Sequence, residues 1–196
     1  GQPRRLTTAS DRFEFFPSFS RDGKSLVFVA WNDERLGTVR KLDLDSGRET
    51  TITPMPGKYL SPRFSPDGKQ VVYEKVRGGY LTSPWYALDL GVYLASADGK
   101  GTPQRLTKDG SDPQFGKGSD AVYFTRTAVT SEVDALHKLI RLDLADRQET
   151  EVARSEFASD YAVSPDGQWL GFVERFHAYV TPLPQTSAAA VRTVSR

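Results

Sequence analysis

The stretch LSPRFSPDGKQVVYEKV, from Leu60 to Val76, has the composition of a β-hairpin. A short strand ends at Phe64, and Pro-Asp-Gly at 66–68 favours a type I turn with glycine in the left-handed position. The strand that follows is apolar on both faces, because Val71, Val72 and Tyr73 are consecutive. A strand buried on both faces fits a blade packed between two neighbours, as in a β-propeller.

The same hairpin recurs along the chain. Clear copies are FFPSFSRDGKSLVFVAW (Phe15–Trp31) and DYAVSPDGQWLGFVERF (Asp160–Phe176), and a degraded copy is SDPQFGKGSDAVYFTR (Ser111–Arg126). Equivalent positions recur every 45 to 51 residues, which is close to the period of propeller blades. The repeat therefore predicts a fold built of blades.

Two further strands complete each predicted blade. We expect third strands at 38–44, 91–96, 138–144 and 177–183, and fourth strands at 49–53, 103–107, 149–153 and 190–195. PRRLT at 3–7 matches PQRLT at 103–107, which predicts the last strand of a blade whose other strands lie outside this chain.

The predicted fold is all-β, with about four four-stranded antiparallel blades that form part of a larger propeller. The expected organisation is a single propeller segment over 1–196, with an orphan strand and linker at 1–14 and blades at 15–53, 59–107, 111–153 and 159–195.

Composition excludes several classes of function. Lys and Arg number 26 against 25 Asp and Glu, a net charge of +1, so we expect no nucleic-acid partner. The longest apolar run, Leu26–Trp31, is far shorter than the roughly 20 residues that span a bilayer, so we expect no membrane insertion. The chain has no cysteine, which excludes disulfides, thiol catalysis and thiolate metal sites.

Residues with the chemistry of an active site are few. His137 and His177 lie far apart in sequence, in neither an HxH nor an HExxH arrangement, so we expect no catalytic, cofactor or metal site here. The recurring turn residues are expected to be structural: Asp22, Gly23, Asp67, Gly68, Asp166 and Gly167. Asp112 and Asp160 begin innermost strands, so they are candidates for lining the central channel, and an ordinary turn or capping role is the alternative.

Two insertions distinguish the blades. RGGYLTSPWYALDL (Arg77–Leu90) lengthens the second blade and brings Tyr80, Trp85 and Tyr86 onto one loop. Aromatic residues on such a loop are typical contact residues, and the alternative is that they fold back to cap the blade. TAVTSEVDALHK (127–138) is predicted to be a loop on the corresponding connection of the third blade. The face from which both loops emerge is the predicted contact surface.

These hairpins, with their RLT-type fourth strands, resemble the TolB-like β-propellers, relatives of the WD-repeat and tricorn-type propellers. Arg77–Thr107 and Tyr161–Pro184 resemble the propeller that precedes the catalytic barrel in bacterial amidohydrolase-type proteins. The chain departs from the pattern where GKGSD (116–120) lacks the Pro-Asp-Gly turn. It departs again where Tyr161 stands in place of the proline found at 17, 62 and 113.

The resemblance implies a non-catalytic protein-interaction or substrate-gating module of a larger periplasmic or secreted bacterial protein. Its partner would be another protein or the rest of its own chain, and open blade edges would favour pairing with a second copy. The alternative is the propeller part of an amidohydrolase- or peptidase-type hydrolase whose catalytic domain lies outside this chain. A third reading, a calcium- or small-ligand-binding propeller, needs clustered carboxylates, and only Asp112 and Asp160 are available.

Overall fold

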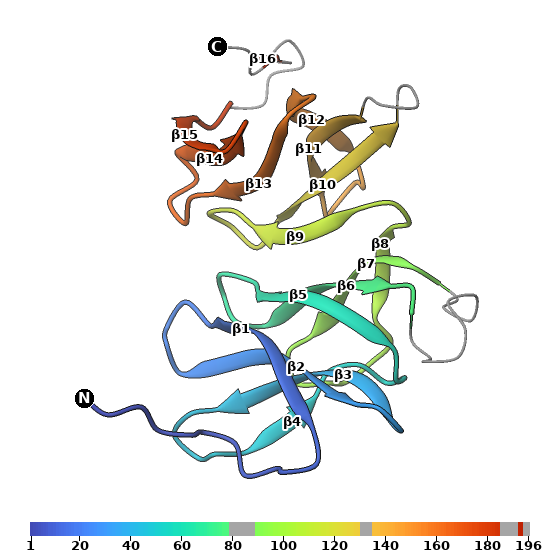
Figure 1. The fold of residues 1–196 in the computed structure, drawn as a ribbon, viewed down its shortest axis with the longest axis vertical. Coiled ribbons are helices and arrows are strands. Elements are labelled where there is room, and N and C mark those ends of the chain that lie inside the picture. The colour runs from blue at the N-terminus through green and yellow to red at the C-terminus, as the bar shows by residue number, and fades with distance from the viewer. Residues whose placement is uncertain (79–88, 130–134, 185–191, 194–196) are drawn as a thin grey trace. The chain divides into compact units, whose positions relative to one another are not determined.

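The computed structural model describes residues 1–78, 89–129, 135–184 and 192–193, and Figure 1 shows their arrangement. Every regular element in this part of the chain is a β-strand. The strands are β1 (Phe13–Phe19), β2 (Ser25–Asn32), β3 (Leu36–Asp43), β4 (Glu49–Thr51), β5 (Lys58–Phe64), β6 (Gln70–Val76), β7 (Gly91–Ser96), β8 (Gln104–Thr107), β9 (Ser111–Phe115), β10 (Ala121–Val129), β11 (Ala135–Asp143), β12 (Glu149–Ser155), β13 (Ala158–Val163), β14 (Trp169–Glu174), β15 (His177–Pro182) and β16 (Arg192–Thr193).

Consecutive strands pair into four small antiparallel sheets, which are the blades of a β-propeller. Their strand orders are β1-β2-β3-β4, β5-β6-β7-β8, β9-β10-β11-β12 with β16 added beside β12, and β13-β14-β15. We call these sheets blades 1 to 4. The all-β fold with antiparallel blades is confirmed.

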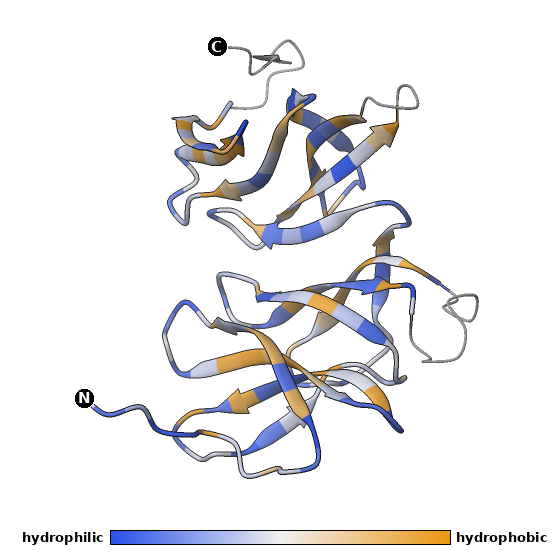
Figure 2. Cartoon of the chain, in the orientation of Figure 1, coloured by the Kyte–Doolittle hydropathy of each residue, from blue (hydrophilic) through white to orange (hydrophobic). Residues whose placement is uncertain are grey.

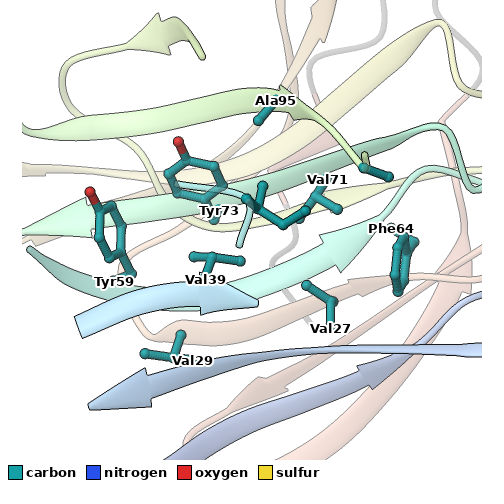
Figure 3. Close-up of a cluster of buried hydrophobic side chains, with 10 residues drawn as sticks. Val27, Val29, Val39, Tyr59, Phe64, Val71, Tyr73 and Ala95 are labelled. Atoms are coloured by element: carbon teal, nitrogen blue, oxygen red, sulfur yellow. The ribbon is translucent and has the colours of Figure 1, made fainter. Parts of the chain in front are cut away.

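The chain divides into two compact units, Gly1–Lys108 with blades 1 and 2 and Asp109–Arg196 with blades 3 and 4. In the first unit, apolar side chains from the two blades form one core (Figure 3). Val27, Val29 and Val39 of blade 1 lie against Tyr59 and Tyr73 of blade 2, whose rings meet edge to face with centroids 5.4 Å apart. In β2 both faces are buried, as predicted for a strand between neighbours.

The second unit repeats this packing between blades 3 and 4. Leu139 and Val152 of blade 3 share a buried cluster with Tyr161, Leu170 and Phe172 of blade 4. Figure 2 shows the strands striped orange and blue, as expected where one set of alternate side chains packs inward.

The hairpin turns have the geometry expected from their sequence. Gly68 has φ of +70° and donates its backbone N–H to the carbonyl of Ser65 at 2.9 Å. The Ser65 hydroxyl donates to Asp67 Oδ1 at 2.6 Å, and the same oxygen accepts the Lys69 N–H at 3.1 Å. The turns at 20–25 and 164–169 repeat these bonds. The pKa values of Asp22 and Asp166 are lowered, mainly by the hydrogen bond from the serine hydroxyl and to a lesser extent by the bond from a backbone N–H.

Two predicted elements are wrong. Residues 127–129 and 135–138 extend β10 and β11 rather than forming a loop, since the pairing continues to Val129 opposite Ala135. Residues 3–7 have no strand structure in the described chain; their neighbours were expected outside this chain, so the orphan strand stays a prediction.

The second wrong element is the last strand of blade 4. Arg192 and Thr193 pair in parallel with Ala153 and Arg154 of β12, not with β15. β12 extends to Ser155, two residues beyond the predicted end, and its outer edge is therefore long enough to accept them. The rest of 190–195 lies outside the described residues.

Candidate functional site

Each innermost strand contains a β-bulge at the same repeat position. One residue there has positive φ: 54° at Phe16, 48° at Ser61, 49° at Asp112 and 53° at Asp160. In all four blades the pairing with the second strand gains one extra residue at this point. A non-glycine residue in this region costs about 1–3 kcal/mol, and bulges re-aim side chains at rims and functional sites.

The bulge separates an exposed side chain from a buried one. Phe16, Asp112 and Asp160 are exposed, whereas the next residue is buried in blades 2 to 4. That next residue is Pro62, Pro113 or Tyr161. The position requires a buried, mainly apolar side chain rather than proline itself, which explains why tyrosine can replace proline in blade 4. The Tyr161 hydroxyl donates to the His137 carbonyl at 3.3 Å, and burial raises the pKa of Tyr161 to about 12.

Gln114 holds the two bulged strands of the second unit together. Its Nε2 donates to the Tyr161 carbonyl at 2.6 Å, and its Oε1 accepts the Val163 N–H at 2.8 Å. Asp112 and Asp160 therefore occupy equivalent places on two connected strands. The Asp160 carboxylate also accepts the Ser159 hydroxyl at 2.8 Å. That these two carboxylates line a channel stays a prediction.

The first unit carries an exposed aromatic surface on β1. We define the β1 aromatic surface as three phenylalanines with these exposed fractions: Phe13 62%, Phe15 45% and Phe16 43%. Phe19 is also exposed, but it pairs with Leu26 and lies on the other face of the blade. The rings of Phe13 and Phe15 lie 6.4 Å apart, and those of Phe15 and Phe16 lie 6.3 Å apart. Soluble proteins seldom expose such apolar groups together unless the surface binds something.

Sequence reasoning missed this surface and the exposure of Phe19. In the repeat, Phe19 is equivalent to Phe64 and Phe115, which end the innermost strands of blades 2 and 3. Those two are 8% exposed, whereas Phe19 is 63% exposed. The available signal was FEFFPSF at 13–19, where aromatic residues occupy positions of both strand faces.

A charged cluster covers the opposite face of blade 1. The Arg12 guanidinium lies 5.6 Å from the centre of the Phe28 ring and pairs with Glu14 at 2.8 Å and Glu49 at 2.6 Å. The hydrogen bond from Arg12 lowers the pKa of Glu49, and the bond to Glu49 raises the pKa of Arg12. Blade 3 repeats this arrangement with Arg126, Phe124 and Glu149. The recurrence indicates a structural cap on the blade face.

The second unit contains an open groove of about 900 Å³. Val152, Phe172, Tyr179 and Val180 give it an apolar lining, and Glu174 adds a carboxylate. The rings of Phe172 and Tyr179 stack with centroids 5.4 Å apart. β15 borders this groove, and within the described ranges no strand pairs with its outer edge.

No protein-family model matches the chain. Over 79 residues the chain is 29% identical to the Tol-Pal system protein TolB of Rickettsia massiliae, covering 40% of this chain and 18% of that protein. The TolB of Rickettsia akari is 32% identical over 63 residues, which cover 32% of this chain and 14% of that protein. The chain thus matches less than a fifth of the length of these curated relatives.

Solved structures of TolB are also similar to this chain. TolB from Acinetobacter baumannii superposes with a TM-score of 0.65 at 20% identity, over 91% of this chain and 42% of that one. The chain has a TolB-like fold. The tricorn protease superposes with a TM-score of 0.69 at 12% identity, over 93% of this chain and 22% of that one. These likenesses establish the fold.

The remaining predicted residues of the TolB-like chain fall in separate places. Tyr80, Trp85 and Tyr86 lie outside the described residues. His137 Nδ1 lies 3.1 Å from the Thr127 hydroxyl across the β10–β11 pair, and His177 Nδ1 lies 2.9 Å from the Arg175 carbonyl. Among the described residues, no three His, Asp or Glu side chains gather in a way that could hold a metal ion. The same part of the chain has no helix long and apolar enough to cross a membrane.

Proposed function

We propose that this TolB-like segment is a non-catalytic protein-interaction or substrate-gating module of a larger bacterial protein of the periplasm or the secreted fraction. The curated relatives are named as TolB of the Tol-Pal system, which supports a role in protein assembly. The partner is another protein or a further part of the same chain.

The observation that carries the proposal is the β1 aromatic surface. Its rings are exposed on a strand that is fixed by pairing with β2, so little conformational entropy is lost when they bind. Fully burying one such ring contributes about 1.5–3 kcal/mol, and buried aromatic anchors dominate the energy of many interfaces. A few phenylalanines therefore suffice for specific binding.

Affinity capture from an extract of the organism that makes the protein tests this proposal. The double variant Phe13→Ser with Phe15→Ser is expected to lose the captured partner. Its affinity should fall at least about a hundredfold if both rings are buried in the complex. Because Phe13 is 62% and Phe15 is 45% exposed, the thermal midpoint should move far less than the affinity. The matched control is Met55→Ser, since Met55 is 65% exposed and lies outside β1.

Equal capture by the wild-type protein and the β1 double variant would rule out this surface as the binding site. Loss of capture with Met55→Ser as well would indicate non-specific adhesion, which also contradicts the proposal.

The predicted contact residues Tyr80, Trp85, Tyr86, Asp112 and Asp160 remain part of this proposal as further candidate contacts. Alanine at Tyr80 and Trp85 should weaken binding of the captured partner without lowering thermal stability. A fall in stability alone would assign the loop a structural role.

The alternative function is the propeller part of an amidohydrolase- or peptidase-type hydrolase. Fold neighbours named as tricorn protease, prolyl endopeptidases and acylaminoacyl peptidase favour it. The gene sequence beyond the codon for Arg196 tests it directly, because this reading requires an HxH-bearing barrel or a Ser-Asp-His hydrolase domain there. Another protein-binding domain in that place would contradict it.

A further inference from the structure

The hairpin of β14 and β15 turns through two residues in an unusual conformation. Glu174 pairs with His177, so Arg175 and Phe176 form a two-residue turn, and their φ values are 47° and 69°. Both positions of such a turn need positive φ, which is why Asn-Gly is the favoured pair. A bulky side chain adopts this conformation only at a cost in stability. We therefore expect the Arg-Phe turn to be less stable than an Asn-Gly turn would be.

The Phe176 ring does not offset this cost within its own blade. It is 101% exposed, so burial of the ring contributes nothing to the fold. Strained backbone that persists without such a contribution is a feature of sites that bind other molecules. The tip of the β14–β15 hairpin, defined as Arg175 and Phe176, is therefore a candidate contact site separate from the β1 aromatic surface.

Hydrogen bonds fix the base of this tip. Ser155 is 5% exposed, and its hydroxyl donates to Glu174 Oε1 at 2.5 Å. The same oxygen accepts the backbone N–H groups of Phe157 and Ala158 at 3.1 Å and 3.2 Å. The Arg175 guanidinium lies 4.4 Å from the centre of the Phe157 ring, a cation–π contact. These contacts join the β12–β13 connection to the hairpin and hold the cation beside the projecting ring.

Arg175 gives the tip a positive charge. Its side chain is exposed, and no ion pair within the described ranges involves it. A guanidinium stacked on a ring still donates hydrogen bonds through its edge, which suits a carboxylate. A matching partner therefore has an apolar pocket for the Phe176 ring and a carboxylate at the rim. A lipid surface fits less well, because one ring gives only weak attachment and the exposed Glu156 repels anionic headgroups.

We propose that the β14–β15 tip is an anchor that inserts Phe176 into an apolar pocket of a different protein, while Arg175 pairs with a carboxylate at the rim of that pocket. This rests on the proposed function only in taking the segment as a protein-interaction module. The residues involved are not those of the β1 aromatic surface, so each surface can fail its own test without the other.

The variant Phe176→Gly tests whether the ring has a structural role. Glycine adopts positive φ without steric cost, and the exposed ring buries nothing, so the midpoint of chemical denaturation should stay the same or rise. Phe172→Ala on the same hairpin is the comparison. Phe172 is 5% exposed, and its loss should lower the midpoint clearly. A lower midpoint for Phe176→Gly would overturn the proposal, since the ring would then stabilise the fold.

Photo-crosslinking of the full-length protein, in the cell that makes it, tests binding. Benzoylphenylalanine, which keeps an aromatic ring, replaces Phe176 or, as the matched control, the exposed Trp169 at the start of β14. We expect one discrete adduct with a different protein from position 176 and none from position 169. Mass spectrometry of the crosslinked peptides should locate the adduct in an apolar pocket with Asp or Glu at its rim.

Charge variants test the second half of the proposal. Arg175→Glu should reduce the adduct from position 176 at least about tenfold, because two carboxylates would then face each other, whereas Arg175→Lys should retain part of it. Phe13→Ser with Phe15→Ser should leave this adduct in place, which separates failure of the tip from failure of the β1 aromatic surface.

Four results would overturn the proposal. They are the absence of an adduct from position 176, the same adduct from position 169, an adduct with lipid or with this chain itself, and an adduct that Arg175→Glu leaves unchanged.

Discussion

Ser65 shows how a single hydroxyl stabilises a blade hairpin. It is fully buried, and its Oγ accepts the Gln70 N–H at 2.9 Å while donating to Asp67 at 2.6 Å. Ser65→Ala should lower the free energy of unfolding by about 1–3 kcal/mol, since a buried backbone N–H loses its partner. Chemical denaturation measures this change.

The matched control is Ser96→Ala. Ser96 makes the same type of bond, to Asp98 Oδ1 at 2.7 Å, but in a half-buried turn, where water can replace the hydroxyl. Ser96→Ala should lower the free energy of unfolding by less than about 1 kcal/mol. Equal losses in the two variants would contradict the assignment of the larger effect to burial.

Glu49 should give blade 1 a pH-dependent contribution to stability. Its Oε1 accepts from Arg12 at 2.6 Å and its Oε2 accepts from Arg40 at 2.8 Å, and the bond from Arg12 is the main cause of its lowered pKa. A pKa below the unfolded value means that the ionised form stabilises the fold. This contribution is present above the unfolded pKa, near 4.3, and is lost as the pH falls through the folded pKa.

Glu49→Gln should therefore lower the free energy of unfolding by about 1 kcal/mol at pH 7. The gap from the unsubstituted protein should close toward pH 3, as denaturation curves at several pH values would show. The control is Glu34→Gln at an exposed position. It should change neither the free energy of unfolding at pH 7 nor the dependence of that free energy on pH. A gap that stays constant with pH would contradict the role of the charge.

At this scale the sequence predicts the turns but not the bulges. Asp-Gly after serine specifies a turn through bonds that its own atoms make. In contrast, the residues with positive φ at the bulges are Phe16, Ser61, Asp112 and Asp160, so the position has no single residue type that would mark it in the sequence. Pairing with the second strand imposes their conformation, so only the three-dimensional context reveals it.

Gln114 is the side chain that joins two elements of the second unit, β9 and β13. Gln114→Ala should lower the free energy of unfolding by about 2 kcal/mol, because the Tyr161 carbonyl and the Val163 N–H both lose a partner. Gln114→Glu should recover part of this loss, since a carboxylate can still accept from Val163. Gln104→Ala, at an exposed site on β8, is the control and should be nearly neutral.

If Gln114→Glu is as destabilising as Gln114→Ala, the bond to Val163 contributes nothing, which contradicts the bridging role. Thermal denaturation of the four proteins side by side decides the point.

Hairpins, third strands and the outer strands of blades 1 to 3 could be predicted from local sequence, whereas the elements near the two ends of the chain could not. Runs of apolar residues and turn residues located β2, β6, β10 and β14 because these signals lie within each segment. The outermost elements depend on which neighbour is present. For that reason 3–7 has the sequence of an outer strand without the structure, and Arg192–Thr193 pairs with β12 rather than β15.

For the molecule as a whole, the repeat predicted the blades and the relatives give the TolB likeness. Functional surfaces were less accessible to sequence reasoning. The β1 aromatic surface depends on Phe13 and Phe15 remaining uncovered beside β2, and exposure is a property of the assembled blades. Asp112 and Asp160 could be singled out because their place in the repeat was visible in the sequence, and their contact role stays a prediction.

Site-specific photo-crosslinking in the living cell can show whether the β1 aromatic surface binds a protein, from a photoreactive amino acid at position 15 of the full-length protein. We expect a discrete covalent adduct from position 15 and none from position 55, which is more exposed. No adduct from position 15, or the same adduct from both positions, would contradict binding by this surface.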